Sequence, residues 1–154
     1  MISKSRRILI SAPQDSVKLY LRELMNMATY EPRIESVQVL ESQGEEARVA
    51  ASGRFLVVPW SGEFDISFTR DGGYHCSMVS GPLRRMECVY HLRPVSGGTV
   101  LTHEEHYLFP VLLRPLAWAI SSWLIRSIDL ELGAIKEGAE LLNRRIQLQR
   151  LQSS

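Results

Sequence analysis

A continuous block of period-two segments between residues 34 and 109 constrains the fold of this chain more than any other feature. Apolar and polar residues alternate most clearly over Glu63–Arg70. This alternation is typical of antiparallel strands that bury one face and expose the other. Turn-forming residues divide the block, and the Pro59–Gly62 segment is expected to be one such break. The predicted strands are 34–41, 46–58, 63–70, 74–80, 84–93 and 99–109.

Helical periodicity lies on both sides of this block. A short strand at 6–12 is followed by a helix start, in which Ser11 is expected to be the cap and Pro13 to fit the first turn. This helix should end near Met27–Tyr30, before Pro32. After Pro115, apolar residues recur every three or four positions as far as Ile146, which predicts a long amphipathic helix. The order of elements predicts an α+β fold in which one antiparallel sheet wraps against a C-terminal helix.

Composition agrees with one soluble domain over residues 1–154. Apolar types make up 45% of the chain, enough for a single core, and the formal net charge is only +1. So small a net charge gives the protein no overall electrostatic attraction to nucleic acid, and no nucleic-acid partner is expected. The two cysteines are too few for a disulfide scaffold. The apolar run near the N-terminus is too short for a signal peptide, so a cytoplasmic protein with reduced thiols is expected.

One segment, residues 107–125, is long and apolar enough to span a membrane, with Arg114 as its one charged residue. Pro110 and Pro115 interrupt it. We therefore expect a buried helix start, or a helix start that lies on a membrane surface. Transient membrane contact would make the protein peripheral to a membrane. The side chains expected to reach a bilayer are Leu112, Leu113, Trp118 and Trp123.

The alternation also predicts the register of two hairpins. A three-residue loop at 81–83 and a four-residue loop at 95–98 keep the apolar faces of neighbouring strands together. The expected pairs are Met78–Met86, Cys76–Cys88, Tyr74–Tyr90, Leu92–Leu101, Tyr90–His103, Cys88–Glu105 and Met86–Tyr107. Directly opposed, Cys76 and Cys88 could bridge, although in a reducing compartment they are expected to be small core residues.

This register places His103 and Glu105 on the inward, apolar face of the sheet. Buried polar groups need partners, so the two side chains could bond each other or a ligand. Alternatively they pair with Tyr90 or a buried water, or the register is off by one and they face solvent. The neighbouring His106 would point to the opposite face and the helical HExxH spacing is absent, so no metal is expected. There is no P-loop, GxGxxG or GxSxG motif, and no cofactor is expected.

Several short motifs together resemble a known family. They read Val79-Ser80-Gly81-Pro82-Leu83-Arg84-Arg85-Met86, then Tyr90-x-Leu-x-Pro94, Gly98-Thr99 and Tyr107-x-Phe109, with Ala28–Pro32, Val37–Glu41 and Ala134–Glu140 around them. Their order and spacing resemble the polyketide cyclase/dehydrase family of the START-like, birch-pollen-allergen-like superfamily (SRPBCC). That superfamily includes coenzyme Q-binding proteins and ribosome-association toxins. The resemblance covers about Arg7 to Leu142. It implies a helix-grip fold, a curved antiparallel sheet of about seven strands around the C-terminal helix with an apolar cavity between them.

This resemblance implies binding of a hydrophobic small molecule such as a lipid, an isoprenoid quinone or a polyketide-like compound, with transport of that molecule as an added role. The expected lining residues are Trp60, Phe64, Phe68, Tyr74, Met78, Met86, Tyr90, Leu101, His103, Glu105, Tyr107, Trp118, Ile120 and Leu124. Alternatively the protein is a cyclase, aromatase or dehydratase. His103 would then be the general acid or base, Glu105 would fix its tautomer, and Tyr90 would donate to a carbonyl oxygen. A third hypothesis, a ribosome-association protein, is disfavoured by five glutamates against one arginine over residues 31–46.

Overall fold

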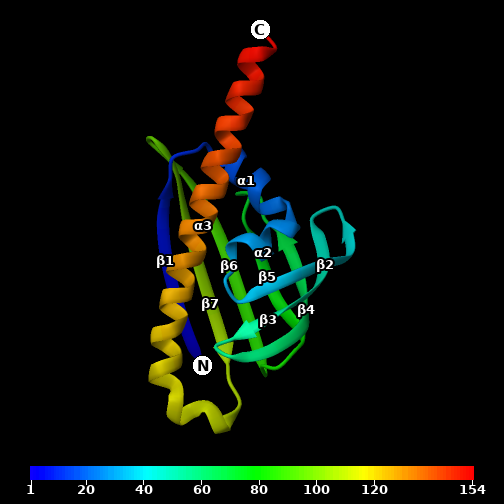
Figure 1. Cartoon of the computed structure of the whole chain (residues 1–154), viewed down its shortest axis with the longest axis vertical. Helices are drawn as coiled ribbons and strands as arrows, with labels where there is room; N and C mark the ends of the chain where they lie inside the picture. The colour runs from blue at the N-terminus through cyan, green and yellow to red at the C-terminus, as the bar shows by residue number, and fades with distance from the viewer.

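Seven antiparallel strands form one sheet in the order β1-β7-β6-β5-β4-β3-β2 (Figure 1). The computed structural model describes all residues, 1–154. The strands are β1 (Ile2–Ile10), β2 (Ile34–Gln43), β3 (Glu46–Phe55), β4 (Val58–Phe68), β5 (Tyr74–Ser80), β6 (Arg85–Val95) and β7 (Gly98–Leu108). The helices are α1 (Gln14–Arg22), η1 (Leu24–Asn26), α2 (Met27–Tyr30), η2 (Val111–Leu116) and α3 (Ala117–Gln152), where η denotes a 3₁₀-helix. The α+β architecture predicted from the sequence is confirmed.

Helix α3 packs along β1 and against α1 and α2, while the sheet curves around it (Figure 1). By length and composition the segment Val111–Gln152 could cross a membrane, but α3 within it is the core helix of the domain. Its predicted apolar stripe is buried along the middle of the helix, at Ile120, Leu124, Ile128, Leu132, Ile135 and Ala139. One hydrophobic core therefore joins α3 to the inner face of the sheet.

The observed strands differ from the predicted ones most at β1, β3 and β4, and by one or two residues at the ends of β2, β6 and β7. Pro59–Gly62 does not break a strand but belongs to β4, and the turn is formed by residues 56–57, with Leu56 at a φ of 58°. The pairing of β4 with β5 begins only at Glu63, so Pro59 has a neighbouring strand on one side only. Such an edge tolerates proline, because its missing N–H need not interrupt a ladder. The first strand also begins earlier, at Ile2, because its outer residues pair with β7.

The first helix begins at Gln14, and Pro13 occupies the cap position without a side-chain hydrogen bond. The prediction that Ser11 caps this helix is therefore wrong. The backbone N–H of Ser11 instead donates to Glu140 Oε1 on α3 at 2.8 Å, which fixes the helix start to α3.

Six of the seven predicted strand pairs are confirmed by the register of β5, β6 and β7. They are Cys76–Cys88, Tyr74–Tyr90, Leu92–Leu101, Tyr90–His103, Cys88–Glu105 and Met86–Tyr107. The pair Met78–Met86 does not form, because the ladder between β5 and β6 ends at Ser77–Glu87. Beyond that point the two strands separate, and both methionines line a cavity.

We expect Gly138→Ala to destabilise the protein by about 1–3 kcal/mol, because a Cβ at this position of α3 would overlap the ring of Tyr20. That Cβ would lie 2.2 Å from Tyr20 Cζ. At Gly133, on the same helix, a Cβ would meet no atom within 4 Å. Gly133→Ala should therefore stabilise the helix by about 0.5–1 kcal/mol. Urea unfolding measures both changes, and a gain in stability from Gly138→Ala would contradict the packing described here.

Candidate functional site

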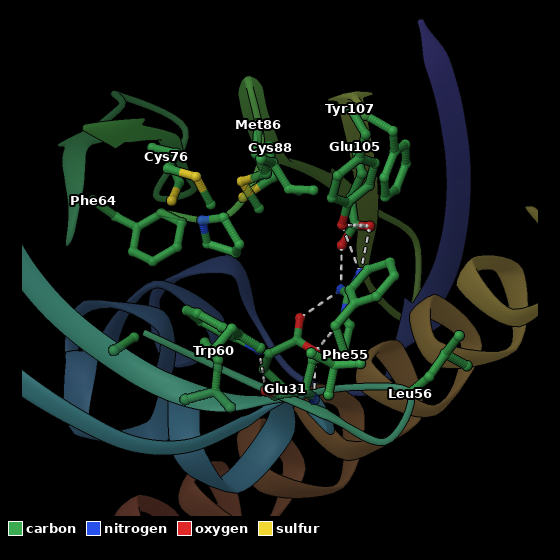
Figure 2. Close-up of a pocket in the computed structure, with 18 of the residues that line it drawn as sticks. Glu31, Phe55, Leu56, Trp60, Phe64, Cys76, Met86, Cys88, Glu105 and Tyr107 are labelled. Carbon is green, nitrogen blue, oxygen red and sulfur yellow. Dashed lines mark hydrogen bonds and ion pairs between the residues drawn. The ribbon is translucent and has the colours of Figure 1, made fainter. Parts of the chain in front are cut away.

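A cavity of about 400 Å³ lies between the inner face of the sheet and the start of α3 (Figure 2). It is lined by 28 residues, of which 22 are hydrophobic. The lining includes exposed residues from three separate segments, among them Leu56, Pro82 and Leu116. These exposed residues mark the mouth of the cavity. Nine of the residues expected to line a cavity do so: Trp60, Phe64, Tyr74, Met78, Met86, Tyr90, Glu105, Tyr107 and Ile120.

The other five expected residues lie outside the lining. Leu101 and Leu124 are buried in the surrounding core, and His103 lies behind Glu105 and Tyr90. Phe68 sits near the far end of β4, where its ring contacts Tyr74 and the Arg22 guanidinium. Trp118 projects into solvent from the first turn of α3. The lining thus combines inward residues of the sheet with Met27 and Tyr30 of α2 and Ile120 of α3.

A buried arginine forms the polar end of the cavity. The Arg33 guanidinium donates to Glu31 through Nε at 2.7 Å and Nη2 at 2.6 Å. Its Nη1 donates to Glu105 Oε2 at 3.0 Å and its Nη2 to Glu105 Oε1 at 2.5 Å. Nη1 also donates to the Tyr107 hydroxyl at 2.6 Å. Figure 2 shows Glu31 and Glu105 converging from opposite sides of the cavity. One guanidinium therefore holds β7 to the segment that precedes β2.

Behind Arg33 lies a second layer of polar groups. His103 Nε2 lies 2.9 Å from Glu105 Oε1 and 3.5 Å from Glu131 Oε2, and its Nδ1 lies 3.1 Å from the Val89 carbonyl. The imidazole stacks on the Tyr90 ring at 4.0 Å between centroids, and the Tyr90 hydroxyl donates to Glu131. No buried side-chain nitrogen or oxygen lacks a partner. The hydrogen bonds of the cluster therefore hold its side chains rigidly in place.

Burial and charge set the protonation of this cluster. Burial raises the pKa of Glu31 to about 8, even though Arg33 opposes this. Burial would lower the pKa of His103, but the charges and hydrogen bonds of Glu131 and Glu105 outweigh it and raise the value to about 10. Burial would raise the pKa of Glu105, but Arg33 and the hydrogen bond to His103 hold it well below its usual range. At neutral pH Glu31 is therefore protonated and Glu105 is ionised, while Arg33 and His103 are positively charged.

The His103 pKa predicts that stability falls as the pH rises above neutrality. A base whose pKa is higher in the folded state stabilises the fold fully below its ordinary value of 6.5, and this contribution is lost as the pH approaches about 10. Glu31 acts in the same direction between 4.5 and about 8, because the folded state also binds its proton more tightly. Urea midpoints measured from pH ~6 to ~10 should fall for the wild type and fall less for His103→Gln. A wild-type midpoint that is constant or rises over this range would contradict the proposed protonation states.

Ligand atoms of His103, Glu105 and Glu131 lie within 4.8 Å of one another, which is close enough to hold a metal ion. However, Arg33 Nη2 already lies 2.5 Å from Glu105 and 3.4 Å from Glu131. The guanidinium thus takes the place that a cation would need. The donor set fits an arginine better than a metal ion.

Sequence reasoning missed Glu31, Arg33 and Glu131. A signal for Glu131 exists, because it lies three residues after Ile128 and four before Ile135, within the buried stripe of α3. A charged residue at such a position must find a partner. Glu31 and Arg33 flank Pro32 between a helix and a strand, where no periodicity shows which way a side chain points.

No protein-family model matches the chain, and no curated protein matches its sequence. Solved structures do match its fold. The Zhui aromatase/cyclase from a Streptomyces species has 17% sequence identity and a TM-score of 0.74, with 90% of this chain and 93% of that chain covered. A START superfamily protein from Mycobacterium smegmatis has 10% identity and a TM-score of 0.72, with 88% and 97% covered. A STAR-related lipid transfer protein from Xanthomonas axonopodis has 14% identity and a TM-score of 0.71, with 89% and 85% covered. The chain has the START-like helix-grip fold that the sequence motifs implied.

Proposed function

We propose that the protein binds a hydrophobic small molecule in the cavity and carries it. The main support for this proposal is the cavity itself. Its volume of about 400 Å³ lies within the usual range of small-molecule sites, and its walls are largely apolar. The similar solved structures include one named as a lipid transfer protein and one named as an aromatase/cyclase, which supports this proposal.

The polar end of the cavity defines the expected ligand further. Glu31, Arg33 and Glu105 belong to the lining, while the rest of the wall is mainly aromatic, aliphatic or sulfur-containing. At neutral pH a protonated Glu31 can donate a hydrogen bond to an oxygen of the ligand. An apolar body with one small oxygen-bearing end fits this arrangement, as in a lipid, an isoprenoid quinone or a polyketide-like molecule.

Titration with N-phenyl-1-naphthylamine, an apolar dye that fluoresces in dry sites, tests the proposal. The wild type should show a saturable rise in fluorescence that corresponds to one dye per chain. A fatty acid, a short-chain quinone and an aromatic polyketide, added separately, should displace the dye to different degrees and so rank the ligand classes. A fluorescence rise that never saturates would refute a defined binding site.

One observation favours a cyclase or dehydratase as the second candidate. Glu31 lines the cavity, and burial raises its pKa to about 8, which suits a general acid. His103 suits the role of base poorly, because both of its ring nitrogens have partners and its pKa is about 10. In this second case, Glu31→Gln should abolish turnover of a poly-β-ketone substrate while dye binding persists. Absence of turnover in the wild type would leave the carrier as the function.

Membrane contact belongs to the same proposal, for a cytoplasmic protein that is peripheral to a membrane. Of the four residues expected to reach a bilayer, Leu112 and Trp118 are exposed. Leu113 lines the cavity instead, and Trp123 packs edge-on against Phe55 with ring centroids 4.5 Å apart. A membrane surface would therefore meet Leu112 and Trp118 first.

A further inference from the structure

Three segments that are distant in the sequence meet around the mouth of the cavity. We call them the mouth segments: residues 54–59 around the turn that joins β3 to β4, residues 81–85 from the β5–β6 loop into β6, and residues 110–118 from just before η2 into the start of α3. All three contribute to the cavity lining, and Phe55, Leu83 and Leu113 share one small hydrophobic cluster. In Figure 1 η2 lies at one end of the long axis, opposite the C-terminus of α3.

Large apolar side chains project outward from the mouth segments. Leu112 is 90% exposed, Val57 81% and Trp118 77%, and none of the three lines the cavity. Leu56, Val58, Val111 and Leu116 beside them are also exposed. A concentration of exposed apolar groups of this size marks a surface that binds another apolar phase or partner. Because Val57, Leu112 and Trp118 do not line the cavity, a flat apolar surface fits them better than a peptide bound in a groove.

The charges of the mouth segments all have one sign. The segments contain Arg54, Arg84, Arg85 and Arg114 and no aspartate or glutamate. Arg54 pairs with Glu35 at 3.3 Å and Arg85 with Glu87 at 2.8 Å. Arg84 and Arg114 form no ion pair and are exposed. Since the whole chain has a net charge of only +1, this excess of positive charge is local.

We propose that the mouth segments dock on a bilayer that contains anionic lipids. Val57, Leu112 and Trp118 would enter the boundary between headgroups and acyl chains, while Arg84 and Arg114 would meet the lipid phosphates. The mouth of the cavity would then face the bilayer, so that an apolar ligand passes between them without crossing water. The ligand transfer in this inference rests on the proposed carrier function. Docking itself depends only on the surface.

Flotation with lipid vesicles tests the docking. Vesicles of phosphatidylcholine alone are compared with vesicles of phosphatidylcholine and phosphatidylglycerol in equal amounts. The wild type should float with the anionic vesicles, and added salt should weaken this binding. The triple variant Val57→Ser, Leu112→Ser, Trp118→Ser should bind about tenfold or more weakly. The double variant Arg84→Gln, Arg114→Gln should lose a similar factor, about tenfold, on the anionic vesicles.

Matched controls lie at the opposite end of α3, which projects beyond the sheet (Figure 1). Leu148→Ser with Leu151→Ser removes two exposed leucines, and Arg145→Gln with Arg150→Gln removes two exposed arginines. Both control pairs should float like the wild type. Equal flotation of wild type and mouth variants, or an equal loss in the controls, would overturn the proposal.

Dye titration separates this inference from the proposed function. None of the five substituted mouth residues lines the cavity, so the mouth variants should bind N-phenyl-1-naphthylamine in solution like the wild type. A wild type that binds dye but floats with neither vesicle overturns the docking alone and would point to an acidic protein as the partner. A wild type that floats with anionic vesicles but binds no dye overturns the carrier function and leaves the docking in place.

Discussion

Replacing Arg33 by methionine is expected to destabilise the fold by about 3–5 kcal/mol, because it removes the cation that Glu31 and Glu105 share. Both carboxyl groups are buried, so the lost hydrogen bonds leave polar groups in a largely apolar site. The Tyr107 hydroxyl also loses a donor. Urea unfolding at neutral pH measures the loss as a lower midpoint at an unchanged slope.

Arg48 provides the matched control. It forms a similar two-point ion pair with Asp65, with Nε and Oδ1 2.8 Å apart, but on the exposed face of the sheet. Arg48→Met should therefore cost about 0–1 kcal/mol. Similar losses for the two variants would mean that burial of the Arg33 cluster has no energetic consequence. That outcome would contradict the electrostatic account of the site.

Replacing Ala51 by phenylalanine should weaken the binding of N-phenyl-1-naphthylamine by about tenfold or more, because the new ring fills space that the dye needs. Ala51 lies on β3, is buried and lines the cavity. The ring enters an existing hollow rather than a packed core, so stability should change by less than about 1.5 kcal/mol. Dye titration and urea unfolding of the same preparation measure both effects.

The neighbouring Ala50 is the control, since successive side chains of a strand point to opposite faces of a sheet. Ala50 does not line the cavity. Ala50→Phe should leave dye binding unchanged. If both variants bind dye like the wild type, the dye occupies some other place on the protein.

Much of the sheet follows from local pattern. In β5, β6 and β7 the alternation identifies the inward residues and the short loops limit the register, so six of seven pairs are predicted correctly. The inward positions of His103 and Glu105 follow from the same two constraints. The exception, Met78–Met86, lies where the strands separate beside the cavity, and alternation contains no information about such a separation.

The remainder of the site depends on tertiary structure. Arg33 reaches Glu105 across 72 positions of sequence, and only the curvature of the sheet brings the two together. Proline commonly ends a strand, so Pro59 predicts a break. At Pro59, however, β4 pairs only with β3, and a strand with one neighbour tolerates proline. A hollow between sheet and helix depends on that curvature as well, so periodicity predicts which residues face inward but not which of them surround empty space.

Native mass spectrometry of the protein purified from its own host without detergent tests whether the cavity holds a hydrophobic ligand. We expect one small apolar molecule per wild-type chain, released on denaturation and absent from Ala51→Phe. Added N-phenyl-1-naphthylamine shows whether a complex survives the measurement. A wild-type chain at its bare mass, under conditions that retain the added dye, would contradict the claim that the cavity holds a hydrophobic ligand.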